Sequence, residues 1–183
     1  MNKILTCVIA AWMAATVSLP ASGGEYRFSH ISIDNGLSKN TVHGFVQDKD
    51  GYIWIATFNG LNRFDGYSVK VFKNDQDQDM SIISNLVTSI DYDGDKCIWA
   101  GTSNGLSIYD KDRQIFENNL ESVSIDALKL LDKNTALVAT PDSLIVYDKI
   151  HGTSHNIKHQ GKDIKAYVLS RGERERDIHR HME

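Results

Sequence analysis

The sequence predicts an all-β fold built from a unit that is repeated along the chain, and three observations support this prediction. First, residues 51–65 align without a gap with residues 96–110, and the two tryptophans, Trp54 and Trp99, are 45 positions apart. Second, a fainter third copy follows, in which Leu137 stands in place of the tryptophan. Third, apolar residues within a unit alternate with the period of two that is typical of a strand, without the 3.6-residue period of a helix.

The spacing of turn residues divides each unit into short strands. In the first unit an Asp-Lys-Asp-Gly turn lies at 48–51, and Asn59-Gly60 supplies the positive φ angles that a tight hairpin needs. Four strands are therefore expected there, at residues 42–47, 52–57, 61–65 and 68–72. Four antiparallel strands in roughly 40–45 residues make one blade of a β-propeller. We predict a partial β-propeller of four-stranded antiparallel blades, with about three to three and a half blades.

The chain is expected to have three parts. Residues 1–23 have a basic start at Lys3, an apolar run and a small-residue exit, which predict a secretory signal peptide and an exported, periplasmic protein. The apolar run is shorter than a membrane-spanning helix requires. Residues 24–170 hold the β-propeller repeats, expected at about 28–73, 74–118 and 119–158 with the start of a fourth at 162–170. Residues 171–183 form a charged tail that is not propeller sequence.

In the tail at 171–183, basic and acidic residues alternate, and the sequence there lacks the tryptophan-containing strand expected of a fourth unit. Closed propellers use about 4–8 blades, whereas an open array leaves unpaired strand edges. We therefore expect a truncated or frame-shifted gene product, or a fragment. A short solvated helix is the alternative for the tail.

Composition argues against several kinds of chemistry. The net charge of −4 does not favour nucleic acid or an anionic membrane as partner. Cys97 is the only cysteine outside the signal segment, so no disulfide is expected, and its place beside a strand tryptophan predicts a buried packing residue. Two acidic sets have alternating spacing but lack the glycine and glutamate of a calcium loop. These sets are Asp75, Asp77, Asp79 and Asp91, Asp93, Asp95. No metal, cofactor or catalytic residues are predicted.

Candidate binding residues are sought on the innermost strands, whose ends reach the rim of a propeller channel. Four polar residues lie near or along those strands: Asn40, His43, Asn85 and Thr88. Structural hydrogen bonding would explain them equally well, so the ligand-binding residues stay unknown at this stage. Both strand tryptophans are expected to pack between neighbouring blades rather than to bind a ligand.

Long stretches of the first two units resemble the two-component regulator propeller repeat. The first unit carries Asn35-Gly36-Leu37-Ser38-Lys39-Asn40-Thr41-Val42, then Asp48-Lys49-Asp50-Gly51-Tyr52-Ile53-Trp54-Ile55-Ala56-Thr57, then Gly60-Leu61-Asn62-Arg63-Phe64-Asp65. The family pattern has Asp at Asn35 and Gly at Ala56, whereas the second unit restores Gly101. The third unit keeps only the skeleton of the pattern.

The resemblance implies a role in sensing. Such repeats form the periplasmic sensor part of hybrid two-component histidine kinases of Gram-negative bacteria, which join two propellers, a small β-sandwich, a membrane helix and signalling modules. Many of these sensors detect oligosaccharides. The resemblance therefore implies an N-terminal fragment of a ligand-sensing propeller that regulates polysaccharide or oligosaccharide utilisation. Its partners would be an oligosaccharide and the remaining propeller and sandwich domains, as a homodimer.

Catalysis by this chain is not expected, because the kinase module of such a parent protein is absent from it. Three alternatives remain open. The chain could be a stand-alone exported propeller used for binding, a polysaccharide-degrading enzyme, or a non-functional truncated remnant.

Overall fold

The computed structural model describes residues 28–78, 80–159 and 162–163. The chain divides into two units, residues 1–30 and 31–183, and the fold described below belongs to the second. The predicted signal peptide at 1–23, the charged tail at 171–183 and all but two residues of the expected fourth repeat lie outside the described residues.

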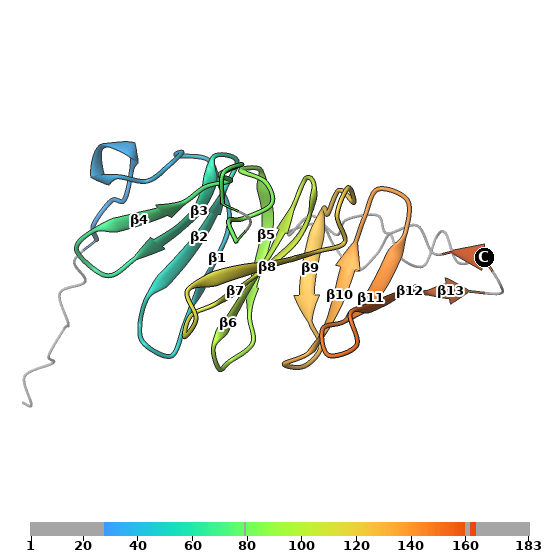
Figure 1. The fold of residues 1–183 in the computed structure, drawn as a ribbon. Coiled ribbons are helices and arrows are strands. Elements are labelled where there is room, and N and C mark those ends of the chain that lie inside the picture. The colour runs from blue at the N-terminus through green and yellow to red at the C-terminus, as the bar shows by residue number, and fades with distance from the viewer. Residues whose placement is uncertain (1–27, 79, 160–161, 164–183) are drawn as a thin grey trace, which may run out of the picture. The chain divides into compact units, whose positions relative to one another are not determined.

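Three four-stranded antiparallel sheets follow one another along the chain (Figure 1). Blade 1 contains β1 (Val42–Gln47), β2 (Ile53–Thr57), β3 (Gly60–Phe64) and β4 (Val69–Phe72). Blade 2 contains β5 (Val87–Tyr92), β6 (Cys97–Thr102), β7 (Gly105–Asp110) and β8 (Ile115–Asn119). Blade 3 contains β9 (Ala127–Leu130), β10 (Thr135–Ala139), β11 (Leu144–Asp148) and β12 (Thr153–Asn156).

Each blade is a meander in which sequential strands are hydrogen-bonded neighbours. The all-β prediction with four-stranded blades is confirmed, and the ends of the expected strands in the first unit differ from the observed ones by at most one residue. A 3-10 turn, η1 (Ile33–Asn35), precedes blade 1, and the two-residue strands β13 (Lys158–His159) and β14 (Lys162–Asp163) pair after blade 3.

The blades pack face to face, with β1 against β5 and β5 against β9. Trp54 of β2 is fully buried in a cluster that also holds Ile98, Ala100 and Tyr109 of blade 2. Trp99 of β6 occupies the same position one repeat later and is buried against blade 3. The prediction that both tryptophans pack between blades is confirmed. The blade 2–3 cluster includes Leu128, Ala136, Val138, Ile145 and Tyr147.

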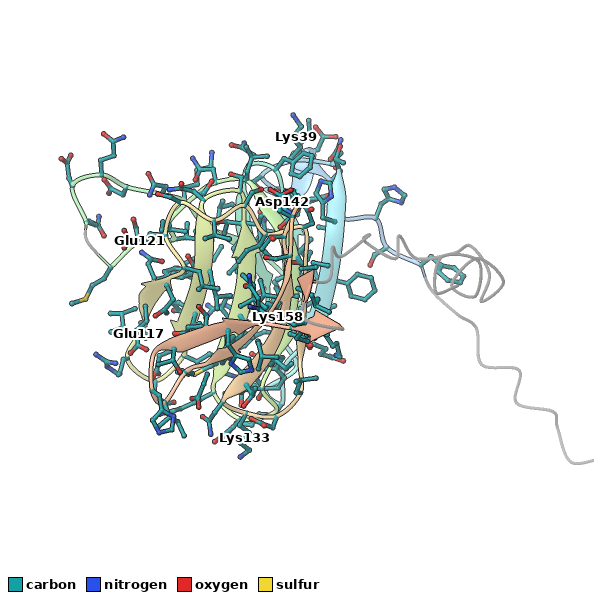
Figure 2. All side chains as sticks on the ribbon, turned by 90° about the vertical axis from the view of Figure 1, so that its right-hand side faces the viewer. Lys39, Glu117, Glu121, Lys133, Asp142 and Lys158 are labelled. Atoms are coloured by element: carbon teal, nitrogen blue, oxygen red, sulfur yellow. The ribbon has the colours of Figure 1, made fainter. Side chains whose placement is uncertain are left out.

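Connections gather at two opposite ends of the sheets, because antiparallel strands return the chain to the same end every second turn. We call one end the upper rim, and it consists of residues 31–41, 58–59, 73–78, 80–86, 103–104, 120–126 and 140–143. The lower rim consists of residues 48–52, 65–68, 93–96, 111–114, 131–134 and 149–152. Figure 2 shows Lys39 and Asp142 at the upper rim and Lys133 at the lower rim.

Candidate functional site

The ion pairs of the described residues gather at the lower rim. Seven of the eight ion pairs among the described residues include a lower-rim residue, and the eighth joins Lys129 and Asp91 at the lower ends of β9 and β5. None of the eight includes an upper-rim residue. Charged groups at the lower rim are thus used for packing, and the upper rim is the better place to look for a ligand.

Asp48 is the best-connected acid at the lower rim. One carboxylate oxygen accepts the backbone N–H groups of Asp50 and Tyr52, at 3.0 and 3.1 Å. The other accepts Trp54 Nε1 at 2.9 Å and Lys111 Nζ from blade 2, also at 2.9 Å. Burial would raise the pKa of Asp48, but the hydrogen bonds from the indole and the lysine outweigh it and hold that pKa below its usual range.

The acidic sets found in the sequence also serve the loops. Asp75 accepts the N–H of Asp77 at 3.1 Å, whereas Asp79 lies outside the described residues. Asp93 accepts the N–H groups of Asp95 and Cys97, at 2.8 and 3.0 Å. Within the described ranges, no group of three His, Cys, Asp or Glu side chains is placed to hold a metal ion.

The remaining acid of the second set, Asp91, forms the ion pair with Lys129 at 2.7 Å. It also accepts the backbone N–H of Leu130 at 2.9 Å. Both contacts join blade 2 to blade 3, which is a packing role.

Cys97 is buried in the core between blades 2 and 3. Burial raises the pKa of its thiol, which keeps the sulfur in the neutral form. Lys149 donates to Cys97 Sγ at 3.1 Å from the turn after β11. The environment is that of a packing residue, as the sequence predicted.

Three of the four predicted rim residues have structural roles. Asn40 Oδ1 accepts the N–H of Ile33 at 2.9 Å, which fixes the turn before blade 1. Asn85 Oδ1 accepts the N–H of Asn74 at 2.7 Å. Thr88 Oγ1 lies 2.6 Å from the carbonyl oxygen of Ile125 and therefore ties blade 2 to the segment leading into blade 3.

His43 is placed differently. The register of β1 with β2 shifts between Val42 and Gly44, so His43 is the extra residue of a β-bulge at the upper end of β1. Bulges redirect a side chain and are common beside functional sites. The exposed imidazole stacks on Phe58, with ring centroids 3.6 Å apart and an angle of 28° between the planes. Phe58 is 41% exposed and lies in the turn between β2 and β3.

Sequence reasoning singled out His43 but missed Phe58. The available signal was the comparison of repeats, since the turn position held by Phe58 is Ser103 in the second unit and Pro141 in the third. The aromatic residue at this turn therefore distinguishes the first unit from the other two. His43 and Phe58 are the candidate site that this part of the chain offers.

Comparison with known proteins supports the family resemblance. Residues 36–59 match the family described as two component regulator propeller. The chain is also 32% identical over 79 residues to Histidine kinase P4 of Formosa agariphila, a match that spans 43% of this chain and 6% of that protein.

Two solved structures from B. thetaiotaomicron are similar. One is the extracellular domain assigned to the hybrid two component system BT3049, with a TM-score of 0.63 and 25% identity over 70% of this chain and 20% of that chain. The other is the extracellular domain assigned to the one component system BT4673, with a TM-score of 0.60 and 26% identity over 76% of this chain and 19% of that chain.

The match covers the segment before β1 together with β1 and β2, and the resemblance predicted from the sequence is confirmed. The chain spans about a fifth or less of the length of the proteins it matches. No helix within the described ranges has both the length and the apolar character needed to cross a bilayer.

Proposed function

We propose that this chain is the N-terminal part of an exported, periplasmic sensor propeller that binds an oligosaccharide and regulates polysaccharide utilisation through a hybrid two-component histidine kinase. The observation that carries the proposal is the likeness of its blades to the extracellular domain assigned to BT3049, at a TM-score of 0.63. The match to Histidine kinase P4 supports the same class of parent protein.

The role of the chain is binding rather than catalysis. Its lower-rim carboxylates are used in ion pairs and loop hydrogen bonds, as for Asp48 and Asp93. Further partners are the remaining propeller and β-sandwich domains of the parent sensor, in a homodimer. Nucleic acid and the membrane itself are not among the proposed partners, and no cofactor takes part.

Signal transfer would use the ion pairs between blades. Lys111 of blade 2 reaches two acids of blade 1, and Lys129 of blade 3 reaches Asp91 of blade 2. A ligand bound to blade 1 would shift the blades from one arrangement to another only if it bound the second arrangement more tightly. We propose that this shift is passed to the partner domains.

The test is thermal unfolding of the full chain in the presence of oligosaccharides, with maltohexaose, cellohexaose, xylohexaose and mannohexaose as probes. A ligand present at about 100 times its dissociation constant adds roughly 2.7 kcal/mol to stability, which raises the midpoint by roughly 5–10 °C in a chain of this size. The monosaccharides glucose, xylose and mannose are the controls. If no oligosaccharide of the panel raises the midpoint above its monosaccharide, the proposed function is wrong.

A further inference from the structure

Two basic side chains on the outer strands of blade 1 take no part in the ion pairs of the described residues. Arg63 of β3 and Lys70 of β4 are directly opposite each other in the antiparallel pairing, so both side chains lie on the same face of the sheet. Trp54 is the partner of Arg63 on β2, and its burial against blade 2 shows that this face is turned toward blade 2. We call Arg63 and Lys70 the outer basic pair.

The outer basic pair lies over aromatic rings. The guanidinium carbon of Arg63 is 4.6 Å from the centroid of the Tyr52 ring and 5.9 Å from that of the Trp54 ring. Lys70 Nζ is 4.9 Å from the centroid of the Phe72 ring. The Trp54 and Phe72 rings are themselves stacked, with centroids 5.6 Å apart. The two cations are therefore held on neighbouring rings.

Within the described ranges, no acid balances the charges of the outer basic pair. Arg63 Nε is buried without a hydrogen-bond partner, and neither side chain forms an ion pair. Asp65, the acid that follows β3, accepts hydrogen bonds from Tyr67 and Ser68 of its own turn. Like charges directly opposite each other destabilise a sheet, and removing a cation from water without a counter-charge adds to that cost. A bound anion would offset both effects.

Blade 2 contributes a hydroxyl group beside the outer basic pair. The Tyr109 ring lies 5.3 Å from the Trp54 ring and 5.0 Å from the Phe72 ring, measured between centroids. Burial raises the pKa of Tyr109, and the nearby positive charge of Arg63 opposes this effect only in part. The hydroxyl group therefore keeps its proton at neutral pH and can donate it to an anion.

We propose that the outer basic pair and Tyr109 form a binding site for a phosphate-type oxyanion between blades 1 and 2. A guanidinium donates two parallel hydrogen bonds to an oxyanion, and an ammonium adds a further donor and a second charge. A carboxylate would use both of its oxygens on the guanidinium, whereas a phosphate group retains oxygens for Lys70 and Tyr109. This inference concerns a different ligand from the oligosaccharide and does not rest on the proposed function.

The paired cations are a feature of blade 1 alone among the three blades. The equivalent pair of opposite residues is Ile108 and Glu117 in blade 2 and Val146 and His155 in blade 3. The chain thus supplies a residue for a variant, because Arg63→Ile places in blade 1 the side chain that blade 2 carries at position 108.

The test is an NMR titration of the full chain with sodium phosphate, in which sodium chloride keeps the ionic strength constant and the Arg63 Nε–H signal is followed. Glycerol 3-phosphate and acetate are titrated in the same way. Affinities of the wild type and of three variants are measured by calorimetry. Arg63→Ile and Lys70→Met each remove one charge of the site. The matched control is Lys73→Met, which removes the charge of an exposed lysine just beyond the end of β4.

Phosphate should shift the Arg63 signal until the site is saturated. Lys70→Met should weaken phosphate binding about tenfold, as expected when one charge-assisted hydrogen bond is lost, and Arg63→Ile should weaken it about a hundredfold or more. Lys73→Met should bind as the wild type does. Tighter binding of glycerol 3-phosphate than of inorganic phosphate would identify a phosphoryl group on a larger molecule as the ligand, and the reverse order would identify the free ion; both results support the site.

Three results would overturn the site. They are an Arg63 signal that does not reach saturation, an affinity for acetate equal to that for phosphate, and an unchanged phosphate affinity in Lys70→Met. Because Lys70 is exposed, its variant decides the question even if Arg63→Ile fails to fold. None of these results bears on the binding of oligosaccharides, so the proposed function is tested separately.

Discussion

Replacing Lys111 with methionine tests whether one ion-pair link holds blade 1 to blade 2. Lys111 Nζ lies 2.9 Å from Asp48 and 2.7 Å from Asp50. Methionine preserves most of the aliphatic length and removes only the charge. The side chain of Asp48 is completely buried, so losing a hydrogen bond from a charged donor costs about 1.5–3 kcal/mol there. The pair with half-exposed Asp50 adds at most about 1 kcal/mol.

The expected loss of stability for Lys111→Met is therefore about 3 kcal/mol. With a typical urea slope of about 2 kcal/mol per molar, the midpoint should fall by roughly 1.5 M. Tryptophan fluorescence is the assay, because Trp54 lies in the interface that opens. The matched control is Lys149→Met. Lys149 occupies the same place one repeat later but donates to the thiol of Cys97, so its loss should cost about 1 kcal/mol or less.

The difference between wild type and Lys111→Met should also depend on pH. The pKa of Asp48 is held below its unfolded value, so the unfolded chain binds the proton first as pH falls. The stabilising effect is thus fully present above the unfolded pKa of about 3.9 and is lost as pH falls through the lower, folded pKa. Equal losses for the two lysine variants, or a difference that persists unchanged after Asp48 is protonated, would show that this link does not hold the blades together.

Three further predictions concern buried residues. Trp54→Phe should lower the free energy of unfolding in urea by about 1–3 kcal/mol more than Trp99→Phe does. The Trp54 indole donates to a carboxylate, whereas Trp99 Nε1 has no partner in the described part of the chain. Equal losses for the two variants would contradict this. Gly101→Ala should lower stability by about 1–3 kcal/mol, since a Cβ there would lie 2.7 Å from Ile125 Cγ2; an unchanged thermal midpoint would refute the contact. The Cys97 thiol, buried and with a raised pKa, should react with iodoacetamide far more slowly in the native protein than in urea, and equal rates would disprove its burial.

The fold could be predicted from the sequence because its signals are local and occur more than once. Asn59-Gly60 and its copy Asn104-Gly105 mark hairpin turns whose glycines have φ angles of 126° and 144°. The strand tryptophans have flanking residues of the same kind, so their shared burial followed from the alignment of repeats.

The site was less predictable because its contacts join residues from different strands and turns. Residue types alone do not reveal that Asn85 and Thr88 form hydrogen bonds, whereas no hydrogen bond of the His43 side chain is found among the described residues. Nor does a strand pattern show that a bulge turns His43 toward Phe58, since a bulge is a property of the pairing of two strands.

The separation of the two rims has a consequence for how such a scaffold diversifies. All the ion pairs of the described residues lie toward the lower rim, so substitutions at the upper rim leave them intact. Blades 1 and 2 already differ at the upper rim, with rings in one and small hydroxyl residues in the other, on nearly the same backbone. Duplicated copies of one blade can therefore acquire different surfaces for new molecules while they keep the ion pairs of the lower rim.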